Sequence, residues 1–170
     1  MTIWWLATSK NEGHCSYDEL KDRKVLAQGW PALGDLSDLL PISDKHVFIE
    51  TINKRVKDAY SGWEDERNPG RIIFNLFKFK ENDLILCTEG ETVKGIAKVG
   101  SNPKYRYDNK YKYEYEYAQA IYPVNEWKDW DVDLAGNPPY TKARGPVGIN
   151  LYKGDEHIVL DAWKILPLST

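Results

Sequence analysis

The hydrophobic pattern at the start of the chain predicts a strand, a short helix and a second strand. Residues 3–7 form a compact apolar run, as a buried strand does. Ser16 and, three residues later, Glu19 form a capping box, which predicts a helix that begins there. Residues 25–30 then favour a second strand, which ends on Trp30 between a glycine and a proline.

Two further helices are predicted before the middle of the chain. Ser43 is placed to cap the longer one, in which apolar residues recur at the i, i+3 and i+4 spacing of one helix face. The polar segment 61–70 contains Gly and Pro and separates it from a short apolar helix over residues 71–79. The face of the longer helix is made by Val47, Phe48, Ile49, Ile52, Val56 and Tyr60.

Strands dominate the predicted second half. Residues 83–100 place two β-rich runs around a turn at Glu89 and Gly90, which predicts a hairpin. Residues 111–123 are also expected to form a half-buried strand, because tyrosines alternate with charged side chains over residues 111–117. A last strand is expected over residues 157–166, after a Gly- and Pro-rich segment. Helices followed by strands indicate an α+β fold with a curved or barrel-like sheet, flanked by short helices.

Length and composition favour one soluble domain. The chain has 170 residues, of which 42% are hydrophobic and 29% charged, so we expect residues 1–170 to form a single globular unit. No apolar run approaches the roughly 20 residues of a membrane helix, and the apolar start lacks a basic leader, so we expect a cytoplasmic protein without a membrane partner. Cys15 and Cys87 lie far apart and are expected to be reduced thiols.

The charge pattern leaves two interpretations open. The net charge of −3 argues against binding nucleic acid by overall charge. A locally basic segment between residues 94 and 112 indicates either a basic face or an ordinary solvated surface. Its cations are Lys94, Lys98, Lys104, Arg106, Lys110 and Lys112, against Asp108.

Sequence patterns of common enzymes are absent. The chain has no G-x-S-x-G, no phosphate-binding loop, no G-x-G-x-x-G and no H-E-x-x-H, and its three histidines are scattered. Two acid-x-Lys triplets, at residues 19–21 and 126–128, are too short to indicate a nuclease. We therefore expect neither an enzyme, nor a metal site, nor a cofactor.

Aromatic content is the most distinctive feature of the composition. The chain has seven Trp and eleven Tyr, and aromatic faces stack on nucleic-acid bases. Neighbours in a strand face opposite sides, so Trp4 and Trp5 cannot share one core layer, and we assign Trp5 to the rim of a pocket. Trp30, by itself, fits a core residue as well as a pocket wall, whereas Trp163 is expected in the core.

The order of these elements resembles the PUA-like superfamily, in particular its EVE and YTH branches. "WWLATSKNEGHCSYDELK" is similar to the opening strand, polar segment and short helix of that family. "ENDLILCTEGETVKGIAKV" is similar to its central strands, with the Gly-hydrophobic-Ala signature at residues 95–97. "GWPALGDL" and "NPGRIIFNLFKFKENDLIL" look more like the N-terminal DNA-reader domains of McrB-type and Mrr-like restriction systems. The resemblance extends to about Trp127.

The resemblance implies a reader that flips a modified base into an aromatic pocket and that has no catalytic residues of its own. Trp30 matches the first wall of that pocket, and Ser9, Lys10 and Asn11 match the polar segment that contacts the base and its sugar-phosphate. The second wall lacks its tryptophan in this chain. The candidates for this second wall are Tyr115, Tyr117 and Trp63.

Further contacts are expected around this pocket. Asp35 is placed to accept from an exocyclic amine, although an Asp after Gly is more often a turn former. Phosphate contacts, which fix position and not sequence, are expected from Lys94, Lys98, Lys104 and Arg106.

The first hypothesis is therefore a DNA-binding specificity domain for a modified base, associated with an NTPase or nuclease of a restriction system. DNA is favoured over RNA as the partner. The alternatives are an RNA-processing factor or small enzyme with the same barrel, and a purely structural or protein-binding module.

Overall fold

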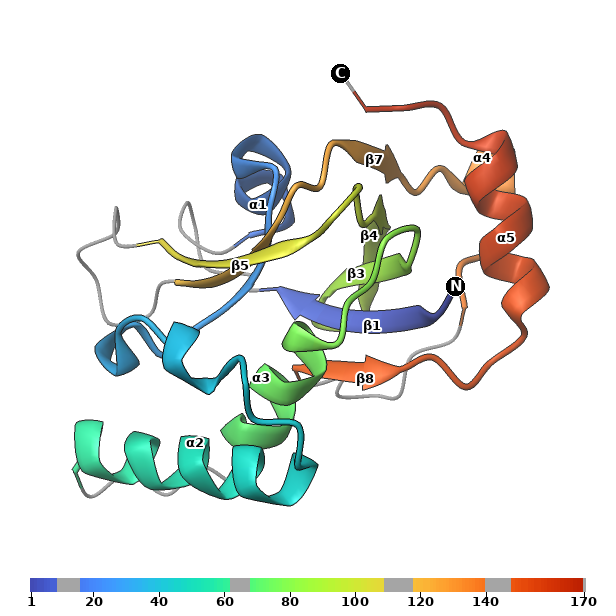
Figure 1. Ribbon diagram of the computed structural model, residues 1–170. Coiled ribbons are helices and arrows are strands. Elements are labelled where there is room, and N and C mark those ends of the chain that lie inside the picture. The colour runs from blue at the N-terminus through green and yellow to red at the C-terminus, as the bar shows by residue number, and fades with distance from the viewer. Residues whose placement is uncertain (9–15, 62–67, 109–117, 140–147, 170) are drawn as a thin grey trace.

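The computed structural model describes residues 1–8, 16–61, 68–108, 118–139 and 148–169, which form two β-sheets with helices around them (Figure 1). The larger sheet has five strands in the order β7-β4-β3-β1-β8, in which β1 and β3 are parallel and the other pairs antiparallel. Its strands are β1 (Ile3–Thr8), β3 (Leu84–Glu89), β4 (Thr92–Lys98), β7 (Glu126–Asp129) and β8 (Ile149–Leu151).

The smaller sheet is antiparallel and has the order β2-β6-β5. Its strands are β2 (Leu26–Gln28), β5 (Lys104–Tyr107) and β6 (Gln119–Tyr122). The helices are α1 (Tyr17–Arg23), α2 (Lys45–Ala59), α3 (Pro69–Phe77), α4 (Val132–Ala135) and α5 (Glu156–Ile165), with 3₁₀ turns η1 (Pro31–Leu33) and η2 (Ser37–Leu39).

This arrangement confirms the predicted mixed α+β fold, but it differs from the predicted barrel-like sheet. The two sheets do not close on each other among the described strands. After β6 the chain reaches Pro123, which has no N–H to extend the β6 ladder, and it then joins the larger sheet as β7. The side chain of Gln28 bridges the sheets, because its Nε2 donates to the Ala7 carbonyl at 3.4 Å.

Local sequence signals account for most of the first half. Ser16 caps α1 by accepting from the Glu19 amide at 3.2 Å, as its half of the capping box requires. The hairpin of β3 and β4 and the short helix α3 are also confirmed. The first part of the predicted strand over residues 111–123 lies outside the described residues, and β6 lies within its last part.

Two details of α2 differ from the prediction. Its cap is Asp44 and not Ser43, since the Asp44 carboxylate accepts from the Val47 amide at 3.0 Å. The buried face consists of Phe48, Ile52 and Val56, spaced four residues apart. Val47 is exposed, because an interval of one residue turns it away from that face.

The predicted last strand is wrong, because this segment is helix α5. Asp155 caps it by accepting from the His157 amide at 2.9 Å. Val159, Ala162 and Leu166 are buried at intervals of three and four residues, which is the period of a helix face. The large apolar side chains of this segment are compatible with a strand as well as with a helix. The N-cap at Asp155 favours the helix. Helices are therefore not confined to the first half.

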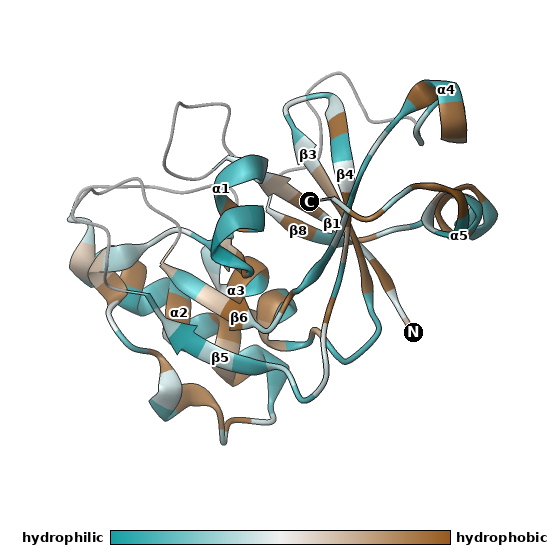
Figure 2. Cartoon of the chain, turned by 90° about the horizontal axis from the view of Figure 1, so that it is seen from above, coloured by the Kyte–Doolittle hydropathy of each residue, from teal (hydrophilic) through white to brown (hydrophobic). Residues whose placement is uncertain are grey.

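The core has two parts, one on each face of the larger sheet (Figure 2). The main cluster lies between the two sheets and helices α2 and α3, and the second lies under α5. Trp4 belongs to the main cluster and Trp5 packs against the second, which confirms that they face opposite ways. Trp163 is half-buried against the second cluster.

Cys87 is fully buried as a free thiol, and this burial raises its pKa. Cys15 lies outside the described residues. Among the described helices, none combines the length and the apolar character that crossing a membrane requires.

Candidate functional site

Trp30 occupies an unusual backbone conformation directly after β2. Its φ of 58° and ψ of 55° place it in the left-handed region, and its side chain is 7% exposed within the main core cluster. A bulky L-residue there costs roughly 1–2 kcal/mol, so the surroundings must hold it. The structure thus buries the tryptophan that the resemblance assigns to a pocket wall.

Gln119 of β6 holds both ends of the turn that follows Trp30. Its Nε2 donates to the Trp30 carbonyl at 3.3 Å and to the Gly34 carbonyl at 3.0 Å. Its Oε1 accepts from the Tyr105 hydroxyl, whose oxygen in turn accepts from the Leu36 amide at 3.0 Å. Gln119 has no exposed surface, so these bonds are made away from water.

Two further tyrosines bind the same turn. The Tyr107 hydroxyl donates to the Pro31 carbonyl at 2.8 Å, and the Tyr60 hydroxyl accepts from the Ala32 amide at 3.1 Å. Tyr60 at the end of α2 and side chains from β5 and β6 therefore fix residues 30–36, which we call the Trp30 turn. None of these side chains is among the predicted site residues, although the period-two pattern of "KYRY" at residues 104–107 is typical of a strand with two different faces.

The opposite face of β5 carries positive charge. Because side chains alternate along a strand, Lys104 and Arg106 point away from the Trp30 turn that Tyr105 and Tyr107 bind. The Arg106 guanidinium lies 4.7 Å from the centroid of the Tyr122 ring, and this cation–π contact fixes the position of the guanidinium. One strand thus joins the Trp30 turn to two of the predicted phosphate contacts.

A buried carboxylate lies between two guanidinium groups beside this strand. Asp108 is 5% exposed, and its Oδ2 is 3.0 Å from Nη2 of Arg23 and 3.6 Å from Nη2 of Arg106. The Arg23 side chain is 8% exposed. Two positive groups thus contact one negative group, and Arg106 is the more accessible of the two.

Other predicted site residues are not brought to the Trp30 turn. Trp5 packs against Tyr152, with ring centroids 5.5 Å apart, in the cluster under α5. Lys98 lies on the same face of β4 as Ile96, which belongs to the cluster under α5. Its ammonium is 3.5 Å from the Glu126 carboxylate. Lys94 is on the same strand, at the bulge opposite Cys87 and Thr88. These three residues therefore belong to the larger sheet and not to the sheet that holds Trp30.

Asp35 serves the structure of the turn. Its carboxylate accepts from the Ser37 amide at 2.8 Å and from the Ser37 hydroxyl at 2.5 Å, which is the hydrogen-bonding pattern of an Asx turn. The turn-forming interpretation of Asp35 accounts for these contacts. The remaining predicted site residues lie outside the described residues: Ser9, Lys10, Asn11, Trp63, Tyr115 and Tyr117.

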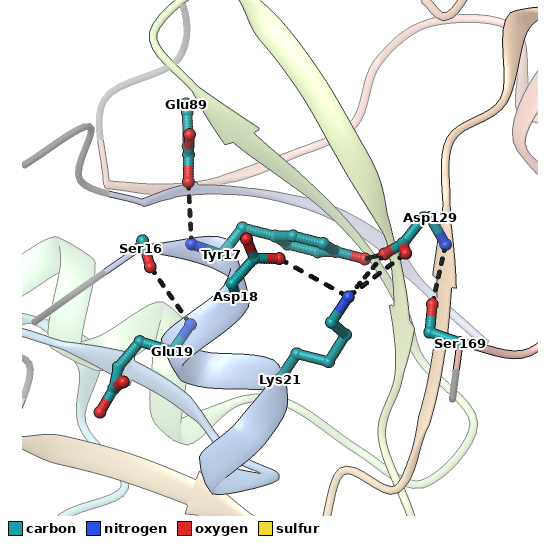
Figure 3. A network of polar contacts seen from close by, with 8 residues as sticks. All are labelled: Ser16, Tyr17, Asp18, Glu19, Lys21, Glu89, Asp129 and Ser169. Carbon is teal, nitrogen blue, oxygen red and sulfur yellow. Dashed lines mark hydrogen bonds and ion pairs between the residues drawn. The ribbon is translucent and has the colours of Figure 1, made fainter. Parts of the chain in front are cut away.

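A second polar network joins α1, β7 and the C-terminal segment (Figure 3). The Tyr17 hydroxyl donates to the Asp129 carboxylate at 2.8 Å, and the Lys21 ammonium lies 3.0 Å from it. The Ser169 hydroxyl accepts from the Asp129 amide at 3.2 Å. Burial, and secondarily the negative groups around it, raises the pKa of Tyr17, which therefore stays a donor at neutral pH.

Side chains of the two acid-x-Lys triplets contact residues from other parts of the chain. Lys21 contacts Asp129, and Glu126 contacts Lys98. The Lys128 ammonium lies 4.5 Å from the centroid of the Trp163 ring. Across the described parts of the chain, no group of three or more His, Cys, Asp or Glu side chains is placed to hold a metal ion.

A hollow of about 540 Å³ lies beside this second network. The sequence analysis did not anticipate it, because residues from β7, the start of α4 and the C-terminal segment meet there only in the fold. It is lined by Asp129, Trp130, Asp131, Val132, Pro167, Leu168 and Ser169.

The Asp129 contacts predict a dependence of stability on pH. Burial by itself raises the pKa of Asp129, but the hydrogen bond from Tyr17 and the contact with Lys21 outweigh it, so the pKa lies below the usual value of an aspartate. The folded state therefore binds fewer protons than the unfolded state, and stability falls as the pH drops through this range. In urea titrations between pH 5 and pH 3, Asp129→Asn should flatten this fall. An equally steep fall in Asp129→Asn contradicts the assignment.

Comparison with known proteins finds no family model that matches the chain, and no curated protein or solved structure with significant similarity to it.

Proposed function

We propose that this chain is a DNA-binding specificity domain of the PUA-like kind, which reads a methylated base after flipping it out of the duplex. The observation that carries the proposal is the buried Trp30 in a left-handed backbone conformation, whose carbonyl accepts from Gln119 and whose turn is further bound by Tyr107 and Tyr60. A residue held in a costly conformation by so many contacts is typical of a ligand-binding position. The resemblance assigns the first pocket wall to the same residue.

The rigidity of the Trp30 turn suits recognition of a small group. A methyl group contributes about 0.8 kcal/mol when buried, so a loose pocket would not distinguish it. A turn whose carbonyls and amides are bound by Gln119, Tyr105, Tyr107 and Tyr60 keeps the aromatic wall in one place. Since Trp30 is 7% exposed, the proposal requires that the side chains covering its ring move aside when the base enters.

Lys104 and Arg106 supply the sequence-independent part of binding. Their side chains project from the face of β5 opposite the Trp30 turn, and Arg106 is held by stacking on Tyr122. Cations on an edge strand can contact phosphates. Each such contact makes the slope of log affinity against log salt concentration steeper by about 0.9, which we call the salt slope. The proposed partner is therefore DNA, within a modification-dependent restriction system that supplies an NTPase or a nuclease.

Variants separate the base contact from the phosphate contacts. Trp30→Leu keeps an apolar side chain but loses the aromatic face, so the preference for a methylated duplex should fall to about onefold, from an expected ~4-fold for one buried methyl group. The double substitution Lys104→Ala and Arg106→Ala should weaken binding of both duplexes equally and reduce the salt slope by roughly 2. Fluorescence anisotropy at several salt concentrations measures both quantities.

Lys98→Ala is the matched control for the phosphate contacts. It removes one positive charge from the larger sheet, on the face that α5 covers, and it should leave the affinity and the salt slope unchanged. Circular dichroism of every variant checks that it is folded. A folded Trp30→Leu variant that keeps the full preference contradicts the pocket assignment. An equal loss in Lys98→Ala contradicts the assignment of the phosphate contacts to β5.

A further inference from the structure

We infer that Tyr105 and Gln119 are positioning residues, which hold Trp30 in its left-handed conformation and thereby set the preference for the modified base. The inference rests on the proposed function. Neither residue was identified from the sequence, and both act through the Trp30 turn.

The contacts form a continuous chain from one end of the turn to the other. The Leu36 amide donates to the Tyr105 hydroxyl, which donates to Oε1 of Gln119. Nε2 of Gln119 then donates to the carbonyls of Trp30 and Gly34. The Gln119 amide is thus used as an acceptor on one side and as a donor on the other, so its orientation is fixed.

The Trp30 carbonyl is the atom through which this chain acts on the backbone angle. The ψ angle of a residue sets where its carbonyl points, and the carbonyl of Trp30 receives bonds from Gln119 Nε2 at 3.3 Å and from the Leu33 amide at 3.1 Å. Rotation of Trp30 out of the left-handed region would break both bonds. This rotation would take the Trp30 carbonyl away from the buried Gln119 amide, which opposes the rotation.

Tyr105 is kept in place as a donor. Its ring packs against Phe77 with centroids 4.7 Å apart, and burial raises the pKa of its hydroxyl, which therefore stays protonated at neutral pH. Removing the hydroxyl alone leaves this packing intact. Tyr105→Phe is therefore a mild change that releases Gln119 and Leu36 from one shared partner.

A positioning role differs from a purely structural one in what it changes. Loss of the Tyr105 hydroxyl should loosen the Trp30 turn without removing the cations on the opposite face of β5. Affinity for an unmodified duplex should therefore stay within about twofold, while the preference for the methylated duplex falls from ~4-fold to about onefold. A structural role alone would lower both affinities together.

The experiment compares Tyr105→Phe with Tyr122→Phe. The control removes a hydroxyl from the neighbouring strand β6, on the opposite face of the same sheet, and it keeps the ring that Arg106 covers. Both proteins are labelled with 5-fluorotryptophan, and the Trp30 resonance among the seven is assigned with Trp30→Phe. Duplex affinities are measured on the same samples.

We expect the Trp30 resonance to shift or broaden in Tyr105→Phe and to stay unchanged in Tyr122→Phe. An unchanged resonance in Tyr105→Phe overturns the positioning role, whatever the duplexes show. A shifted resonance with an unchanged preference overturns the link to specificity. If the wild type itself does not prefer any modified duplex, the proposed function fails, and the resonance still decides whether Tyr105 holds Trp30. Gln119→Leu is the second variant and should repeat the result of Tyr105→Phe.

Discussion

Gly95→Ala is expected to destabilise the fold by about 3 kcal/mol, the upper end of the usual cost of overpacking, because backbone must move to make room. A Cβ at this position would lie 2.1 Å from the Tyr17 hydroxyl oxygen and 2.6 Å from the Lys128 carbonyl oxygen. The carbonyl belongs to strand β7 and cannot rotate away. Urea denaturation of the variant measures the loss.

Two further variants isolate the cause. Gly136→Ala adds the same methyl group where nothing lies within 4 Å, so its cost is that of the backbone alone, about 1–3 kcal/mol for a φ of 76° with a ψ of −167°. Tyr17→Phe removes the nearest clashing atom, and in that background Gly95→Ala should cost about 1 kcal/mol less. Strictly additive losses would show that Tyr17 is not the obstacle. The Gly-hydrophobic-Ala signature of the sequence thus has a packing reason in this chain.

Asp108→Ala is expected to cost about 3–5 kcal/mol, the usual result of removing one partner from a buried ion pair. The Arg23 side chain is 8% exposed and lies 3.0 Å from the carboxylate, so it would keep its charge in the interior without this partner. The thermal unfolding midpoint and a urea titration measure the change.

Asp38→Ala provides the matched control for this second substitution. It removes the same side chain from an ion pair with Arg55, at 2.6 Å, in which both side chains are exposed. Exposed pairs contribute about 0–1 kcal/mol, so the loss should be several times smaller than for Asp108. Equal losses in the two variants would contradict the buried role of Asp108.

Helix caps and strand periods made much of the fold predictable. Ser16 and the alternation of Trp4 and Trp5 placed α1 and the faces of β1 correctly, because these signals lie within a few residues of each other. The segment that forms α5 was misread, because its large apolar side chains fit a strand as well as a helix. The cap at Asp155 was the local signal that decided between them.

The candidate site was predicted only in part, for a different reason. Trp30 could be singled out from the sequence because it stands between Gly29 and Pro31, where a chain usually turns. Gln119 and Tyr105 reach the same turn from strands that are distant in sequence, and no local pattern connects them. Lys98 and Arg106 look alike in the sequence, yet the fold places them on different sheets.

The central claim concerns the methylated base, and the affinity of the wild-type chain tests it most directly. One pair of duplexes differs only by an N6-methyl group on an adenine, and a second pair differs only by a 5-methyl group on a cytosine. All are titrated at one defined salt concentration, together with a matching RNA. We predict a preference of ~4-fold or more for one methylated DNA duplex, as burial of one methyl group gives. Equal affinity for all the duplexes would contradict the account.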